Sequence, residues 1–64
     1  MTAALLGAAV RRARRDSRLT QAELADLAQT SERTIRDIEK GTGSTGLGVF
    51  LRVAATVGVE ITAT

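Results

Sequence analysis

The 64-residue sequence contains no cysteine, histidine, proline, tryptophan or tyrosine, and Phe50 is its only aromatic residue. Without cysteine and histidine, a disulfide framework, a structural zinc site and a Cys/His nucleophile pair are excluded. A single aromatic side chain disfavours a platform on which single-stranded bases stack. The carboxylates lie on predicted helical surfaces of a chain too small for a closed cleft, so we expect no catalysis, no cofactor and no metal.

Long apolar runs are also missing. The longest, residues 3–10, is under half of the roughly 20 residues that a membrane-spanning helix needs. It precedes the arginines, whereas a secretory signal places its positive charge first. We therefore expect a cytoplasmic protein without a membrane segment, with one domain over residues 1–64. So small a domain buries little surface by itself, which favours oligomerisation.

Charge is distributed unevenly along the chain. The net charge is only +2, but residues 11–18 contain five arginines and one aspartate. Such a cluster indicates a surface that faces a polyanion. The alternative is a solvated helix end, where arginine complements the helix dipole.

Apolar residues at helical spacing predict helices over the first forty residues. The first helix covers about residues 3–15, with Thr2 as its N-cap. The second covers about residues 21–28, after a capping box formed by Thr20 and Glu23. The third begins at the cap Ser31, runs to Lys40 and ends at Gly41.

A glycine-rich loop over residues 41–48 leads to a fourth helix that ends at Gly58. The loop formally fits G-x-G-x-x-G, but no strand precedes it, so we reject a nucleotide site. The apolar residues of the fourth helix that we expect to face inward are Leu47, Phe50, Leu51, Ala54 and Val57.

The C-terminal tail alternates apolar and polar residues, which predicts a short β-strand over residues 59–63. A lone strand leaves its backbone donors and acceptors unpaired, and the chain contains no second candidate strand. We therefore expect it to pair with a second copy of the chain, the alternative being a frayed terminus. The proposed dimer strand consists of Val59, Glu60, Ile61, Thr62 and Ala63.

Two short helices joined by a tight turn are typical of a helix-turn-helix unit. Residues 21–41, QAELADLAQTSERTIRDIEKG, resemble the Xre or Cro/C1-type helix-turn-helix family of bacterial and phage repressors. Ala25 lies where that motif needs a small side chain, and Ile35 and Ile38 lie where its second helix packs inward. The resemblance implies an all-α, lambda-repressor-like domain of four or five helices, with the motif over about residues 20–41.

The turn departs from the family pattern. Gln29 replaces the glycine that most members have there, and Thr30 replaces an aliphatic residue. A residue other than glycine in the left-handed conformation costs about 1 kcal/mol. We therefore expect a strained or slightly rearranged turn.

The second helix of such a motif enters the major groove of DNA with its N-terminal residues toward the bases. Arg33 is suited to read guanine bidentately, and Glu32 to accept from cytosine. The alternatives for the arginines are phosphate contacts or pairing along the helix, because Glu32 precedes Arg36 and Arg33 precedes Asp37 by four residues. The predicted base-reading residues are Ser31, Glu32, Arg33, Arg36 and Asp37.

Other residues are predicted to bind phosphates or to support the fold. The resemblance implies phosphate contacts by Gln21, Lys40 and Thr42, and a structural, buried ion pair between Arg14 and Glu39. Thr20 adds a hydroxyl at a helix N-terminus, which favours anions. The remaining arginines of residues 11–18 are also predicted to bind phosphates. They are Arg11, Arg12, Arg15 and Arg18.

The resemblance implies a homodimer that binds double-stranded DNA at a palindromic operator and represses transcription. Its two recognition helices would lie about 34 Å apart. The ending G-V-E-I-T over residues 58–62 is similar to HipB-like antitoxins, which bind a HipA-like kinase toxin and autoregulate their operon. Two alternatives remain. One is a free-standing phage or regulatory repressor, and the other is a protein-binding module that does not read DNA, favoured by acidic Glu32 and Asp37.

Overall fold

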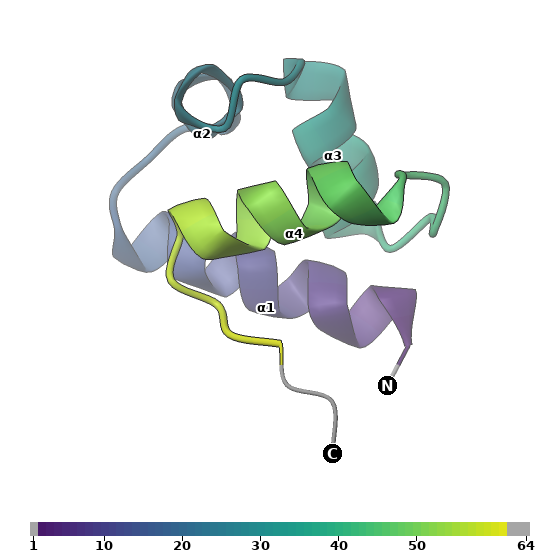
Figure 1. Cartoon of the computed structure of the whole chain (residues 1–64). Coiled ribbons are helices and arrows are strands. Elements are labelled where there is room, and N and C mark those ends of the chain that lie inside the picture. The colour runs from purple at the N-terminus through teal and green to yellow at the C-terminus, as the bar shows by residue number, and fades with distance from the viewer. Residues whose placement is uncertain (1, 62–64) are drawn as a thin grey trace.

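The structure, a computed structural model, describes residues 2–61. Within them the chain forms four helices: α1 Ala3–Asp16, α2 Gln21–Leu27, α3 Glu32–Lys40 and α4 Leu47–Thr56 (Figure 1). None of the four is both long and apolar enough to cross a membrane. The all-α fold is confirmed, and each of the first three helices ends within a residue of its predicted limit.

Polar side chains begin the first three helices, as the sequence predicts. The Thr2 hydroxyl accepts the Leu5 N–H of α1 at 3.2 Å. Thr20 and Glu23 form a complete capping box on α2, in which each residue's side chain accepts the other's backbone N–H. The Ser31 hydroxyl accepts the Thr34 N–H of α3 at 3.1 Å. Each cap satisfies donors that a helix start leaves unpaired.

All four helices end in the same left-handed turn. A residue with positive φ follows each helix, and the next N–H bonds back to a carbonyl in the last turn. Glycine occupies this place after α3 and α4, at Gly41 (φ 74°) and Gly58 (φ 79°). Arg18 (φ 59°) and Gln29 (φ 57°) occupy it after α1 and α2. The predicted strain at Gln29 is thus present, but the turn keeps the ordinary hydrogen bonds.

We expect Gln29→Gly to stabilise the protein by about 1 kcal/mol, because glycine adopts the left-handed conformation without a steric cost. Chemical denaturation monitored by circular dichroism measures the change. Gln29→Ala is the matched control, since alanine keeps the strain while losing the same side chain. An equal gain in both variants would mean that the side chain, not the backbone conformation, is unfavourable.

The core lies where α3 packs against both α1 and α2, while α4 contacts α2. Four side chains from the four helices are fully buried there: Val10, Leu24, Ile35 and Val53. Gly7 allows α1 to pack close to α3. A Cβ at this position would lie only 2.1 Å from the Ile38 carbonyl oxygen, so a larger residue does not fit. The role of Gly7 is not predicted from the sequence, since close approach between two helices is visible only in the fold.

The predicted inward face of α4 is wrong at two positions. Leu47 is 71% exposed and Leu51 is 43% exposed, whereas Val53 is completely buried. Helical spacing fits either an inward face with Leu47 and Leu51 or one rotated toward Val53. Packing against the neighbouring helices selects the second, so two leucines remain on the surface.

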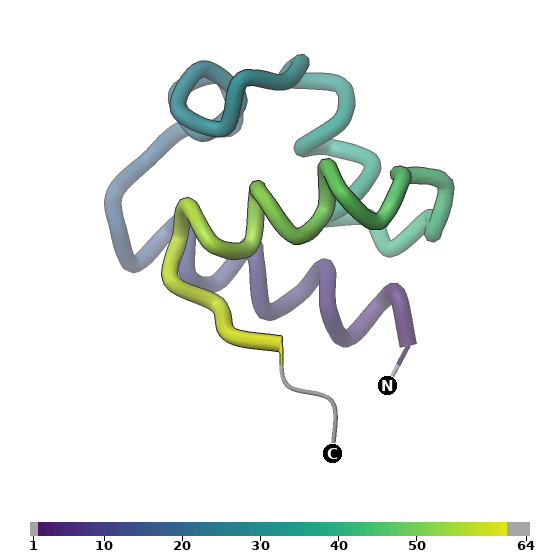
Figure 2. Tube along the Cα trace, in the orientation of Figure 1, coloured from purple at the N-terminus to yellow at the C-terminus, as the bar shows by residue number. Residues whose placement is uncertain are grey.

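The predicted strand over residues 59–63 is not seen. Residues 59–61 follow α4 without forming a strand, and Thr62 and Ala63 lie outside the described residues. Figure 2 shows the chain turning back below α4, where Val59 packs against the core. Strand hydrogen bonding requires a neighbouring strand, and residues 2–61 contain none.

Candidate nucleic-acid interface

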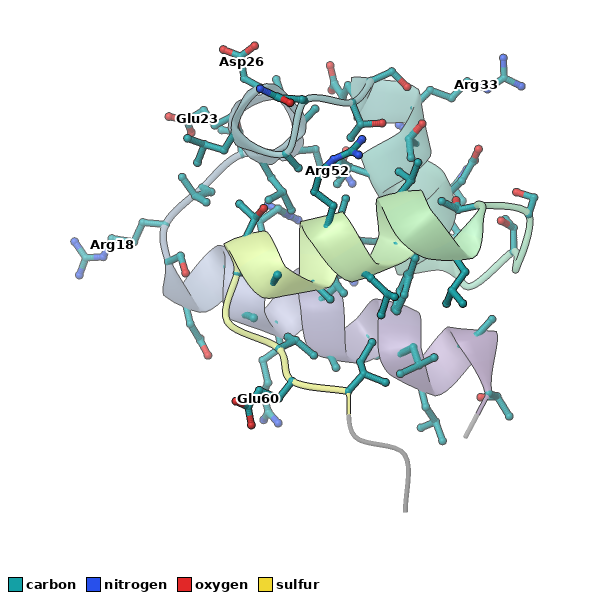
Figure 3. The ribbon with its side chains drawn as sticks, viewed as in Figure 1. Arg18, Glu23, Asp26, Arg33, Arg52 and Glu60 are labelled. Carbon is teal, nitrogen blue, oxygen red and sulfur yellow. The ribbon has the colours of Figure 1, made fainter. Side chains whose placement is uncertain are left out.

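A short turn joins α2 to α3 and sets their relative orientation. The Thr30 N–H donates to the Ala25 carbonyl at 2.9 Å, which closes the turn against the end of α2. Arg52 reaches over from α4, and its Nε donates to the Ala28 carbonyl at 2.7 Å (Figure 3). Its Nη2 also donates to the Gln29 carbonyl at 3.4 Å. Arg52 therefore holds the turn that places α3.

Arg52 is not among the interface residues predicted from the sequence. The one available signal is that Arg52 is the single charged residue of α4. Cationic side chains near a helix C-terminus bind its last carbonyls. Only the fold shows that the helix end in question belongs to α2, 24 residues earlier in the chain.

Arg33 lies on the exposed face of α3 and forms no ion pair within residues 2–61. Its side chain points away from the body of the molecule near the start of the helix (Figure 3). The other predicted base-reading residues are more constrained. The Ser31 hydroxyl caps α3, Arg36 contacts Glu32 at 3.4 Å, and Asp37 is half-buried.

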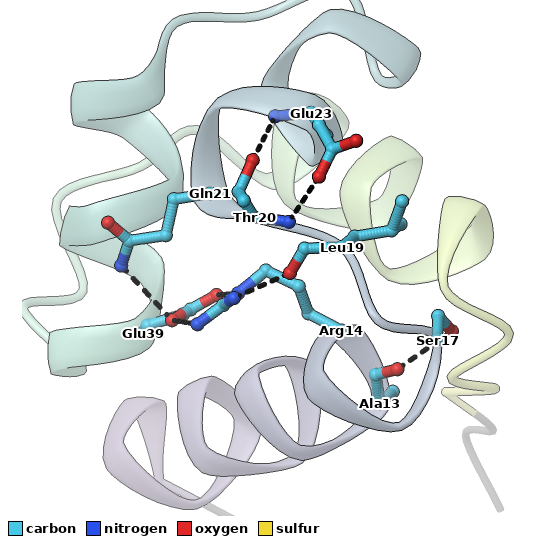
Figure 4. A network of polar contacts seen from close by, with 8 residues as sticks. All are labelled: Ala13, Arg14, Ser17, Leu19, Thr20, Gln21, Glu23 and Glu39. Carbon is cyan, nitrogen blue, oxygen red and sulfur yellow. Dashed lines mark hydrogen bonds and ion pairs between the residues drawn. The ribbon is translucent and has the colours of Figure 1, made fainter.

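Arg14 and Glu39 lie together between α1 and α3 in a network of hydrogen bonds (Figure 4). The Arg14 guanidinium donates to both Glu39 carboxylate oxygens, at 2.6 and 3.0 Å, and to the Leu19 carbonyl at 2.8 Å. The Gln21 amide donates to Glu39 Oε1 at 3.2 Å. This network therefore ties α1, α2 and α3 to one another.

The ion pair is largely shielded from solvent, with side-chain exposure of 12% for Arg14 and 4% for Glu39. The hydrogen bond to Glu39 raises the pKa of Arg14 above its ordinary value; burial opposes this shift, and the charge of Glu39 reinforces it. Arg14 thus remains charged at physiological pH.

Lowering the pH is expected to weaken the cap of α2. Hydrogen bonds from the backbone N–H and then the hydroxyl of Thr20 hold the pKa of Glu23 below its ordinary value of 4.5. A carboxyl group whose pKa is lower in the folded than in the unfolded chain stabilises the fold at pH values above its unfolded pKa. This stabilisation is lost as the pH falls through the folded pKa. Stability should therefore decline as the pH drops below about 4.5.

The control for this pH dependence is Glu23→Gln, whose amide oxygen still completes the capping box but does not ionise. We expect unfolding experiments to show a smaller acid-induced loss in Glu23→Gln than in the wild type. Equal losses in both proteins between about pH 5 and pH 3 would assign the effect to other carboxylates.

The predicted phosphate-binding residues do not form one continuous surface. Arg11, Gln21 and Lys40 meet in a groove that also includes Arg36; we call it the basic groove. Its lining residues are Arg11, Arg14, Gln21, Arg36, Glu39 and Lys40. Arg15 lies with Arg11 and Arg12 in a neighbouring hollow on α1.

Three further phosphate candidates lie outside the basic groove. Arg18 is exposed in the connection between α1 and α2 and points away from the side of Arg33 (Figure 3). The hydroxyl of Thr20 accepts the Glu23 N–H, and that of Thr42 donates to the Asp37 carbonyl at 3.3 Å. Thr20 and Thr42 therefore already have structural roles.

Comparison with known proteins agrees with this geometry. The model of one family, described as a helix-turn-helix domain, matches residues 5–63. None of the curated proteins is similar enough to count as a relative. The matched region includes the capped pair α2 and α3 and the helices that hold them, and domains of this type are those of DNA-binding regulators. The chain therefore belongs to the helix-turn-helix domain family.

Proposed function

We propose that the protein is a sequence-specific regulator that binds double-stranded DNA and represses transcription. The observation that carries the proposal is Arg33, which lies exposed near the start of α3 in a helix-turn-helix unit and forms no ion pair with another described residue. In this motif the start of the second helix faces the base edges in the major groove. Arginine there recognises guanine through its O6 and N7 acceptors.

Selection from a random duplex library at about 150 mM salt tests whether the protein reads sequence. We expect an enriched palindrome with half-sites about ten base pairs apart. A lack of enrichment would contradict the proposal and favour a protein-binding module.

Arg33→Ala is expected to relax the preference at one position of each half-site, at a cost of about 1–3 kcal/mol in discrimination. Competition between the selected site and singly substituted sites measures this cost. Arg12→Ala removes an exposed arginine from α1 and is the control, which should retain the preference. The readout assignment is wrong if Arg33→Ala keeps the full discrimination while remaining folded.

The second part of the proposal is that the surface formed by α4 and the residues that follow it binds a protein partner. Leu51 and Ile61 are 43% and 42% exposed and line a common groove with Ala55 and Val59. Apolar surface of this kind supports a homodimer, and a HipA-like toxin is the further partner if the protein is a HipB-like antitoxin. Deletion of residues 59–64 followed by mass measurement tests the dimer, which should dissociate. An unchanged dimer mass would exclude pairing through the tail.

A further inference from the structure

We propose that Arg52 of α4 is a positioning residue for sequence recognition, which fixes the turn between α2 and α3 and thereby the place at which Arg33 meets a base pair. The inference rests on the proposed function, because it names a further residue on which discrimination between DNA sequences depends. Arg52 lies outside the helix-turn-helix motif of residues 20–41. Its expected effect is on the choice of sequence, without a DNA contact of its own.

Arg52 donates hydrogen bonds to two successive carbonyls where α2 ends. The carbonyls at a helix end lack partners within the helix, and cationic side chains favour that end. Arg52 Nε lies 2.7 Å from the Ala28 carbonyl oxygen, and Nη2 lies 3.4 Å from that of Gln29. A charged donor makes a hydrogen bond about twice as strong as a neutral one. The shorter bond in particular therefore restrains the turn.

The turn needs support from outside the motif because of Gln29. Its backbone is left-handed, with φ 57°, which is unfavourable for a residue that has a Cβ atom. Such a conformation persists only where the surrounding structure over-determines it. The Thr30 N–H supplies one restraint from within the motif, through the Ala25 carbonyl. Arg52 supplies another from α4, on the Gln29 carbonyl itself.

Both ends of this link are placed to fix the position of α3. On α4, Val53 next to Arg52 is completely buried in the core, so the guanidinium extends from a fixed helix. On the other side, Ser31 caps α3 two residues after Gln29, and Arg33 follows two residues later. Figure 3 shows Arg52 reaching from α4 toward this connection, whereas Arg33 points outward. Because a binding contact of this kind tolerates displacements of only about 0.5 Å, a shift of the turn should weaken the reading by Arg33.

The test compares the wild type with Arg52→Met in their preference for the selected duplex over the same duplex with one base pair substituted. Methionine is unbranched and has a helix propensity similar to that of arginine, but it has no hydrogen-bond donor. We expect the preference at the base pair read by Arg33 to fall about tenfold, within the range of one bidentate contact. The slope of log K against log salt should not change, whereas loss of a phosphate contact would reduce it by about 0.9.

Two further variants serve as controls. Val57→Ala truncates a side chain that packs against the core at the end of α4, so it lowers stability without removing the Arg52 donors. It should keep the full preference, because a smaller folded fraction weakens binding to both duplexes equally. Arg33→Ala combined with Arg52→Met should lose little more at that base pair than Arg33→Ala alone, because Arg52 acts through Arg33. Circular dichroism checks that each variant is folded.

The possible results separate this inference from the proposed function. If the wild type selects a sequence and Arg52→Met keeps the full preference, the positioning role is overturned and the proposed function stands. A slope reduced by about 0.9 in Arg52→Met would make Arg52 a phosphate ligand and would also overturn the positioning role. Additive losses in the double variant would mean that Arg52 acts independently of Arg33, which contradicts the inference. If the wild type prefers no duplex, the proposed function fails and the inference fails with it.

Discussion

Replacing Glu39 by glutamine is expected to destabilise the protein by about 3 kcal/mol, because it leaves the Arg14 guanidinium shielded from water without its countercharge. Arg14 makes three hydrogen bonds within the network, two of them to Glu39. The variant keeps the size and shape of the side chain, so the loss measures charge and hydrogen bonding. Urea denaturation followed by circular dichroism gives the difference in the free energy of unfolding.

The chain itself provides a matched control. Glu32 pairs with Arg36 on the same helix, but their side chains are 51% and 47% exposed. Glu32→Gln should therefore change stability by less than about 0.5 kcal/mol. Replacing both members of the shielded pair, as Arg14→Met with Glu39→Leu, should recover most of the loss, because no unpaired charge remains. Similar, small effects of Glu39→Gln and Glu32→Gln would show that shielding adds nothing to the Arg14–Glu39 pair.

The second large effect is expected at Gly7. Alanine normally stabilises a helix relative to glycine, yet Gly7→Ala should destabilise this protein by about 2 kcal/mol. The added Cβ would lie 2.1 Å from the Ile38 carbonyl oxygen and 3.3 Å from that of Glu39, so α1 and α3 must separate. Both contacts are with backbone atoms, which a change of side-chain rotamer cannot relieve.

Gly48→Ala is the matched control for Gly7→Ala. Gly48 also lies in a helix, but a Cβ there would meet no atom within 4 Å. We expect this variant to gain about 0.5 kcal/mol. The same substitution should thus act with opposite sign at the two positions in thermal or chemical denaturation. A stabilising Gly7→Ala would show that α1 and α3 adjust to the extra methyl group without cost.

Gly7→Ala is also expected to change the shape of the basic groove. Arg11 lies one turn further along α1 and lines this groove together with side chains of α3. Separation of α1 from α3 is expected to weaken DNA binding at temperatures where the variant is still folded. Duplex binding by Gly7→Ala and by the wild type, compared at the same salt concentration, measures this loss.

Local sequence determined the limits of the first three helices. The hydroxyls of Thr2, Thr20 and Ser31 cap helices at the predicted positions, and Gly41 ends α3 in a left-handed turn. These features depend on residues within one helical turn of each other, which is why residue type and spacing suffice to predict them. The left-handed conformation of Gln29 is also as predicted, because Gln29 stands where most members of the resembled family have a turn glycine.

Other contacts between helices were decided by tertiary structure. The inward face of α4 includes Val53 in place of Leu47 and Leu51, because packing chooses among apolar faces that the sequence makes nearly equal. Arg52 donates a hydrogen bond to the Ala28 carbonyl at the end of α2, and Arg36 of α3 lines the same groove as Arg11 of α1. These contacts join residues more than twenty positions apart, so helical spacing contains no information about them. The sequence therefore determined where each of the first three helices begins and ends, and the fold determined the grooves between helices, because a groove depends on the relative placement of several helices.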